Sequence, residues 1–101
     1  MTPEDFLADL LAEAADVEVR DDREYKRNGV TFCARTDADA FELRLGPDIA
    51  EAARRTPDTQ ASSRGNDWVR FAPTAWDDHA RDRLEAWFRV AWRSAADRPG
   101  K

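Results

Sequence analysis

The stretch YKRNGVTFCAR, residues 25–35, carries the clearest structural signal in this 101-residue chain. Asn28 and Gly29 both tolerate positive φ, and such a pair between two β-prone runs favours a tight hairpin turn. We therefore predict a β-hairpin with arms at residues 23–27 and 30–36.

Alternation of apolar and polar side chains predicts which face of the sheet each residue occupies. In the second hairpin arm it places Val30, Phe32 and Ala34 on one face and Cys33 on the other. After a turn predicted at residues 37–39, the same period continues through Phe41, Leu43 and Leu45. The result is an antiparallel meander with one buried face.

Further segments add to this meander on both sides. Val17 and Val19 alternate with charged residues and favour a short strand. Residues 68–72 read as another strand, which can pair with residues 60–64 across a turn at residues 64–67.

Three segments combine apolar residues at helical spacing with helix start signals. They are residues 3–15, a second helix that starts at Pro47 and stops before Thr56-Pro57, and a last helix that follows a capping box of Thr74 and Asp77 and runs to about Ala96. The predicted order is helix, three strands, helix, one or two strands, helix. We expect a two-layer α+β fold, with an antiparallel sheet of four to five strands packed with helices. It forms one domain over residues 1–97, followed by a loose tail at residues 98–101.

The charge of the chain is unevenly distributed. The formal net charge is −5, which disfavours a general polyanion binder. Residues 1–22 hold eight of the 21 acidic residues and only one of the 16 basic ones, so the rest of the chain is slightly basic. The acidic start predicts no export signal, the single cysteine excludes an intrachain disulfide, and no apolar run is long enough for a membrane span. We therefore expect a cytoplasmic protein without membrane partners.

Four segments resemble the YjbR/MmcQ-like family of small bacterial proteins. They are YKRNGVTFCAR, FELRLGPDIAEAA, NDWVRF and DDHARDRLEAWFRVAWRSA. The resemblance covers nearly the whole chain and implies a fold similar to that of secretion chaperones. Members are commonly labelled DNA-binding because of a double-wing shape, and no catalytic residues define the family. This chain departs from the family in its charge, because it lacks the lysines that would support the DNA-binding label. It holds 14 arginines but only two lysines.

The loop after the second predicted helix is the first candidate site. Ser62, Ser63 and Arg64 offer two hydroxyls and a guanidinium to an anion such as a phosphate. The alternative is an ordered turn, because no phosphate-loop pattern is present and a strand follows rather than a helix. Three further arginines flank this region: Arg54, Arg55 and Arg70. They form one basic nucleic-acid-binding patch if they converge, and otherwise are solvated surface residues.

Two tryptophans are candidates for a partner surface. Trp76 precedes the last predicted helix and Trp92 lies at the edge of its apolar stripe, whereas Trp87 fits the stripe itself. Tryptophan is enriched at protein interfaces. The alternative for both residues is a place in the core.

Catalytic and metal-binding chemistry finds little support in the sequence. Ser62 and Ser63 lack the Gly-x-Ser-x-Gly elbow, and the one histidine, His79, is interpreted as a surface or capping residue. Cys33 is expected to be covered or half exposed rather than reactive. The pairs Asp37/Asp39 and Asp77/Asp78 are interpreted as a turn and a helix start, because neither recruits the further oxygens that a cation site needs. We propose no catalytic residue, metal or cofactor.

The sequence therefore predicts a non-catalytic binding domain. A protein partner or self-association is the first hypothesis, and DNA binding through an arginine patch is the alternative.

Overall fold

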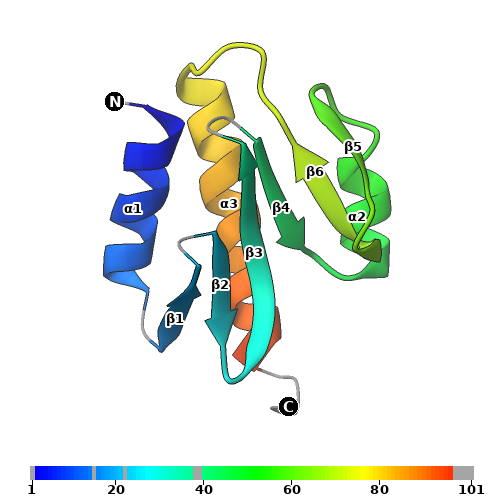
Figure 1. Ribbon diagram of the computed structural model, residues 1–101. Helices are drawn as coiled ribbons and strands as arrows, with labels where there is room; N and C mark the ends of the chain where they lie inside the picture. Colours follow the sequence, from blue (N-terminus) through cyan, green and yellow to red (C-terminus); the bar gives the residue numbers. More distant parts are fainter. Residues whose placement is uncertain (1, 15, 22, 38–39, 97–101) are drawn as a thin grey trace.

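The computed structural model describes residues 2–14, 16–21, 23–37 and 40–96, and it has an α+β fold (Figure 1). Its elements follow in the order α1 (Pro3–Glu13), β1 (Val17–Arg20), β2 (Glu24–Arg27), β3 (Val30–Asp37), β4 (Ala40–Arg44), α2 (Pro47–Ala53), β5 (Thr59–Ser62), β6 (Gly65–Phe71) and α3 (Asp78–Ala96). The predicted tail at residues 98–101 and most of the predicted turn at 37–39 lie outside the described residues.

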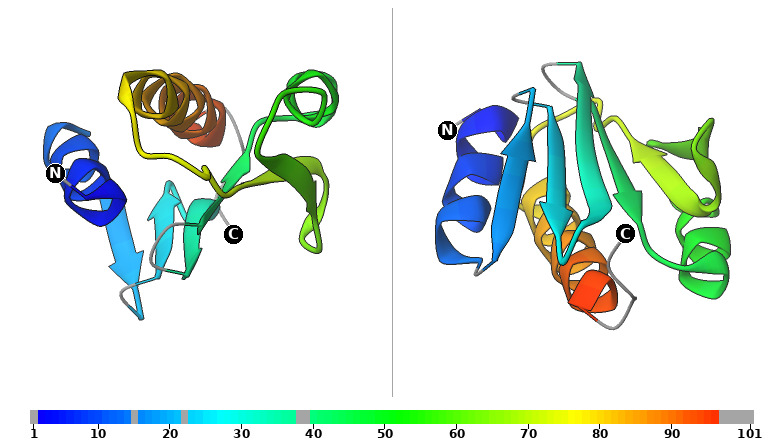
Figure 2. Two further views of the ribbon diagram at one scale, coloured as in Figure 1. Left: turned by 90° about the horizontal axis from the view of Figure 1, so that it is seen from above. Right: turned by 60° about the horizontal axis from the view of Figure 1, so that its bottom comes forward.

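The six strands form one antiparallel sheet in the order β1-β2-β3-β4-β6-β5. All three helices lie on the same side of this sheet, as the view from above shows (Figure 2). Helix α3 packs on β2, β3 and β4, and α2 packs on β6. The fold therefore has two layers, with one face of the sheet covered by helices and the other, which we call the open face, covered by none of the described helices.

The sheet has one strand more than the upper end of the prediction. The short strand predicted at Val17 and Val19 joins the sheet as the edge strand β1 (Val17–Arg20), which gives four strands before α2 where the predicted order counted three. The second hairpin also forms, between β5 and β6. Its turn lies at Ser63 and Arg64, two residues earlier than the centre of the predicted turn, because Gly65 (φ +144°) already pairs with Ser62.

The predicted hairpin at Asn28-Gly29 is confirmed, and both residues have left-handed φ angles of 57° and 76°. The predicted faces of its second arm are right for Val30 and Phe32 and wrong for two residues: Cys33 lies opposite Leu43 on the core face, and Ala34 lies on the other face. A β-bulge shifts the register of β3 against β2, so strict alternation fails at Phe32. Phe32 packs edge-on against Phe88 of α3, whereas Ala34 lies opposite Glu42 on the open face.

Helix termini agree with the sequence at α1 and differ from it at α3. Thr2 and Asp5 form a capping box at the start of α1. At α3 the predicted box starting at Thr74 is wrong, because Asp77 is itself the cap: its carboxylate accepts a hydrogen bond from the backbone N–H of Ala80 at 2.9 Å. This assigns Asp77 the structural role of a helix cap.

The core lies between the sheet and the helices. Its largest fully buried side chains come from β3, β4, β6, α1 and α3: Phe32, Phe41, Phe71, Leu7, Leu43 and Leu84. Phe71 meets Trp87 of α3 edge-on, with ring centroids 5.2 Å apart. Among the described helices, none has both the length and the apolar character that crossing a bilayer requires.

Candidate interaction face

The open face of the sheet gathers the polar residues of the inner strands. The register places Glu24 of β2, Ala34 of β3 and Glu42 of β4 in one cross-strand row. The row continues through Arg70 of β6 and Gln60 of β5. The neighbouring residues of β4, Phe41 and Leu43, point to the other face and are buried in the core. The alternation in β4 and β6 thus separates a hydrophobic helix-covered face from a charged open face.

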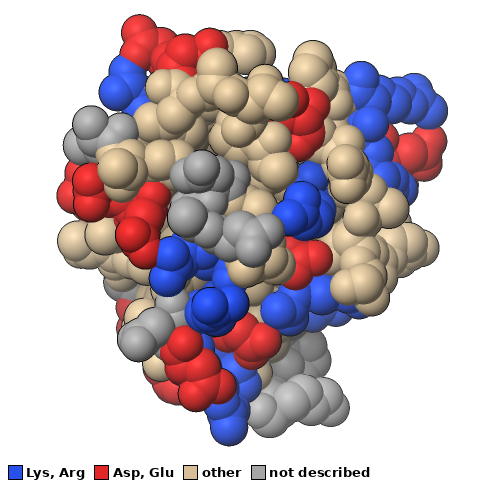
Figure 3. All heavy atoms as spheres, turned by 45° about the horizontal axis from the view of Figure 1, so that its top comes forward, with Lys and Arg blue, Asp and Glu red and all other residues tan. Residues whose placement is uncertain are grey.

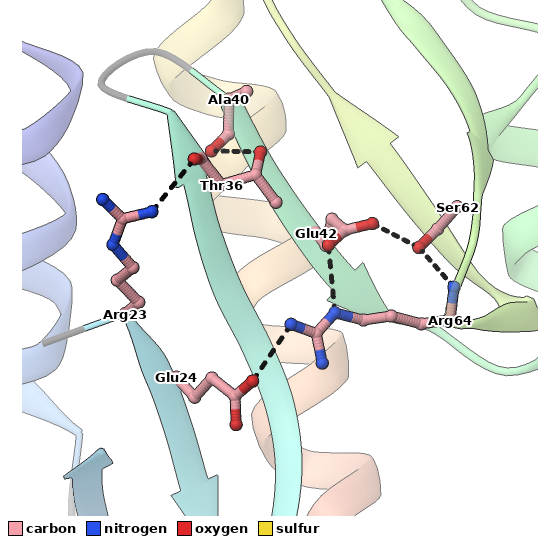
Figure 4. Close-up of polar contacts among 7 residues, drawn as sticks. All are labelled: Arg23, Glu24, Thr36, Ala40, Glu42, Ser62 and Arg64. Atoms are coloured by element: carbon pink, nitrogen blue, oxygen red, sulfur yellow. Dashed lines mark hydrogen bonds and ion pairs between the residues drawn. The ribbon is translucent and has the colours of Figure 1, made fainter. Parts of the chain in front are cut away.

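Arg64 crosses this row from the tip of the β5–β6 hairpin (Figure 4). Its Nε donates to Glu42 Oε1 at 3.0 Å, and its Nη2 donates to Glu24 Oε2 at 3.2 Å. Ala34 lies between the two glutamates in the row, so the guanidinium that joins them spans it, and Ala34 is buried. One side chain therefore ties the hairpin tip to strands β4 and β2.

Glu42 is the most enclosed charged residue among those described, with 5% of its surface exposed. Its second carboxylate oxygen accepts a hydrogen bond from the Ser62 hydroxyl, and that hydroxyl also accepts one from the backbone N–H of Arg64 at 3.1 Å. Burial disfavours the charged guanidinium, but hydrogen bonds to Glu42 and Glu24 outweigh this and raise the pKa of Arg64. We call Glu24, Glu42, Ser62 and Arg64 the open-face network.

An aromatic and a second ion pair border the open-face network. The Arg64 guanidinium carbon lies 5.1 Å from the ring centroid of Trp68, within the range of a cation–π interaction. Arg44, opposite Trp68 in the register, donates its Nε–H to Asp67 at 2.6 Å. Figure 4 also shows a contact between Arg23, just before β2, and Thr36 of β3. The Arg23 Nη1 donates to the Thr36 carbonyl oxygen at 3.5 Å. Arg64 and Arg44 are thus matched by carboxylates close by, and Arg23 is matched by a carbonyl.

The predicted anion-binding residues lie in two places. Ser62 and Arg64 come together in the open-face network, and Arg70 lies on the same face beside Glu42. Arg54 reaches the same hairpin from α2 and donates to the Asn66 carbonyl at 3.2 Å.

Arg55 and Ser63 lie apart from the network. Arg55 is exposed just after the end of α2 and pairs with Glu51 of that helix. Ser63 is exposed in the β5–β6 turn. On the face drawn in Figure 3, basic and acidic side chains are interspersed.

Both predicted partner-surface tryptophans are half-buried against the core. Trp76 meets Phe6 of α1 edge-on, with centroids 5.7 Å apart. Trp92 lies under Arg27, whose guanidinium carbon is 3.6 Å from the ring centroid and whose Nη1 donates to the Trp92 carbonyl at 2.9 Å. Trp92 also lines a cavity of about 90 Å³ between α1 and α3, with Leu10 and Phe88. The two indoles therefore connect α1, α3 and β2.

The remaining chemistry-bearing residues are separated from one another. Cys33 is fully buried in the sheet, and burial raises the pKa of its thiol to about 12. His79 is exposed in the first turn of α3. Within the described part of the chain, no three His, Cys, Asp or Glu side chains are grouped as a metal site would require.

Sequence reasoning missed the two glutamates of the open-face network. The sequence analysis did not single out Glu24 or Glu42, because their shared partner, Arg64, lies 40 and 22 positions further along the chain. The available signal was an acidic residue flanked by two large apolar ones in a central strand, Phe41-Glu42-Leu43, since such a position needs a cation over it. Comparison with known proteins gives no match, whether to a protein-family model, a curated protein or a solved structure.

Proposed function

We propose that this chain is a non-catalytic protein-interaction domain of the YjbR/MmcQ-like kind, which binds its partner through the open face of the sheet. The family part of the proposal rests on the four sequence segments quoted above. The binding part rests on the two-layer architecture, in which helices cover only one side of the sheet (Figure 2). We place the protein in the cytoplasm, on the basis of its single cysteine.

The observation that carries the proposal is the internal neutralisation of charge on the open face. Arg64 is shared by Glu24 and Glu42, and Arg44 is held by Asp67. A surface that carries charges of both signs can complement the charges of a protein partner. It supports recognition of a protein more than attraction of a polyanion, which needs an excess of basic groups.

The contacts of Ser62 support the non-catalytic part of the proposal. A serine nucleophile needs a base that is free to take its proton. Here the hydroxyl contacts Glu42, but the other oxygen of that carboxylate is held by Arg64, so the carboxylate is fixed in place by two partners. We therefore assign Ser62 and Glu42 a structural role in holding the β5–β6 hairpin over the sheet.

DNA binding is the alternative, and one observation favours it. Arg54 and Arg64 both reach the β5–β6 hairpin, where Ser63 is exposed. For Arg64 to contact a phosphate through its Nε, however, it would have to release Glu42, which is almost fully buried, and through the Nη2–H bonded to Glu24 it would have to release that carboxylate. This cost makes DNA binding the second candidate.

The proposal is tested with two variants that each add one guanidinium to an exposed position. Gln60→Arg places it on the open face, next to Arg70 in the register, and Ala52→Arg places it on α2. The tagged protein and both variants are used to capture proteins from a bacterial lysate. A partner that binds the original chain and the Ala52→Arg variant but not the Gln60→Arg variant supports the proposal. Equal capture by all three proteins contradicts it.

A further inference from the structure

Among the described residues, no strand pairs with the outer side of the edge strand β1. It pairs with β2 on one side only, and Glu18, Val19 and Arg20 are all exposed. Val19 is 53% exposed, the largest value among the large hydrophobic residues described. In Figure 1 most of α1 lies above β1, and in the right view of Figure 2 it runs beside the strand. An edge strand of this kind presents backbone N–H and C=O groups to another strand.

The charges of β1 are self-complementary in an antiparallel arrangement. If two copies of Val-Glu-Val-Arg, residues 17–20, pair with a two-fold axis at Val19, each Glu18 lies opposite the Arg20 of the other copy. Val19 then lies opposite its own counterpart, which buries the exposed valine in both copies. Directly opposite residues share a face, so these contacts form within one register.

The same charge alternation already exists within one copy. Inside the sheet, Glu18 lies opposite Lys26 and Arg20 lies opposite Glu24. Across the proposed contact, a row would read Lys26, Glu18, then Arg20 and Glu24 of the second copy, with the sign of charge alternating at every step. Glu24 in turn holds Arg64, which extends the alternation into the open-face network.

We propose that a second copy of this chain pairs with β1, antiparallel and centred on Val19, to form one continuous sheet of twelve strands. The two-fold axis is perpendicular to the sheet, so the open faces of both copies lie on the same side. Strands of four residues bury a small area, which places the dimer among weak, transient assemblies. The inference uses the sheet edge and not the open face, so it holds or fails independently of the proposed function.

Charge reversal tests the pairing. Sedimentation velocity of the full chain from about 10 μM to about 1 mM should show a rising dimer fraction, as a weak interface requires. Glu18→Arg and Arg20→Glu each place like charges opposite one another twice per dimer, and each should weaken the association about tenfold or more. Glu51→Arg and Arg55→Glu, which reverse an exposed pair on α2, are the matched controls and should leave it unchanged.

Mixing the two β1 variants gives the decisive outcome. In an equimolar mixture, the two arginines of the Glu18→Arg variant face the two glutamates of the Arg20→Glu variant, so a heterodimer should form at concentrations where each variant alone is monomeric. In the original chain, amide hydrogens of residues 17–20 should exchange more slowly as concentration rises. A monomer at about 1 mM, or a dimer that neither reversal weakens, or a mixture no more associated than its components, would overturn the inference.

Discussion

Removal of the Arg64 guanidinium probes the open-face network directly. Arg64→Met keeps an unbranched side chain over the sheet but leaves one oxygen of Glu42 without its cation. Breaking a fully buried ion pair costs about 3–5 kcal/mol, and an exposed pair contributes less than about 1 kcal/mol. Glu42 is 7% exposed at its side chain and Arg64 is 31% exposed, so we expect a loss of about 2 kcal/mol in the free energy of unfolding.

The assay is denaturation by urea, followed by tryptophan fluorescence. The midpoint should fall while the slope stays constant, because the surface exposed on unfolding is unchanged. For a domain of this size, the same loss lowers the melting temperature by about 10 °C. The control is Arg55→Met, whose partner Glu51 is exposed, and its free energy of unfolding should stay within about 0.5 kcal/mol of the original.

A double-mutant cycle separates the two carboxylates that share Arg64. The coupling of Arg64 to Glu42 should be about 1–2 kcal/mol, and its coupling to the more exposed Glu24 should be smaller. The reasoning is refuted if Arg64→Met lies within about 0.5 kcal/mol of the original chain, or if both couplings vanish.

Three further substitutions or conditions have defined outcomes. Burial raises the pKa of Cys33 to about 12 from an ordinary value of 9.0, so between these values the folded protein keeps its thiol protonated while the unfolded chain loses the proton. The contribution of Cys33 to the free energy of unfolding is therefore complete below pH 9 and falls as pH rises toward 12. The urea midpoints of the original chain and of Cys33→Ala should converge over that window. The same thiol should react with a disulfide reagent at pH 8 only in denaturant, and rapid labelling of the folded protein would contradict its burial. Gly65→Ala should cost about 1–3 kcal/mol, since φ is +144° and the new Cβ would lie 3.0 Å from the Asp67 carboxylate, whereas an unchanged melting temperature would show that the turn relaxes. Asp77→Ala should lower the free energy of unfolding by about 1 kcal/mol, because it removes the α3 cap. Thr74→Ala, which changes the residue wrongly predicted to cap, should lower it by less. Thermal denaturation of both variants measures the difference.

Local signals in the sequence were sufficient for the elements of this fold. Asn28-Gly29 determines its own turn, because both residues accept positive φ, and Pro3 and Pro47 mark helix starts that the structure reproduces. The number of strands was less certain because β1 is short and mostly exposed, so its apolar pattern is weak. An edge strand of this kind is defined by its partner β2 more than by its own residues.

Long-range packing decided what the sequence left open. The bulge at Phe32 places this ring against Phe88, 56 positions away, and strict alternation cannot show such a shift. Glu42 was not identified as a site residue because Arg64, which binds it, lies on a different hairpin. The candidate arginines were found by composition, but which carboxylate holds each of them depends on the sheet order, in which β4 lies beside β6 rather than β5. A single sequence therefore does not specify which residues pair between strands that are neighbours in the sheet but not consecutive in the chain.

The most direct test of the central claim, that the open face serves a protein rather than a nucleic acid, is fluorescence anisotropy of labelled duplex and single-stranded DNA titrated with the protein across a range of salt. Because Arg64 and Arg44 are held by carboxylates, we expect no change in anisotropy at micromolar protein, even at low salt. Micromolar binding that weakens steeply with salt, and that is lost when Arg54, Arg55, Arg64 and Arg70 are replaced, would contradict the account and assign the surface to DNA.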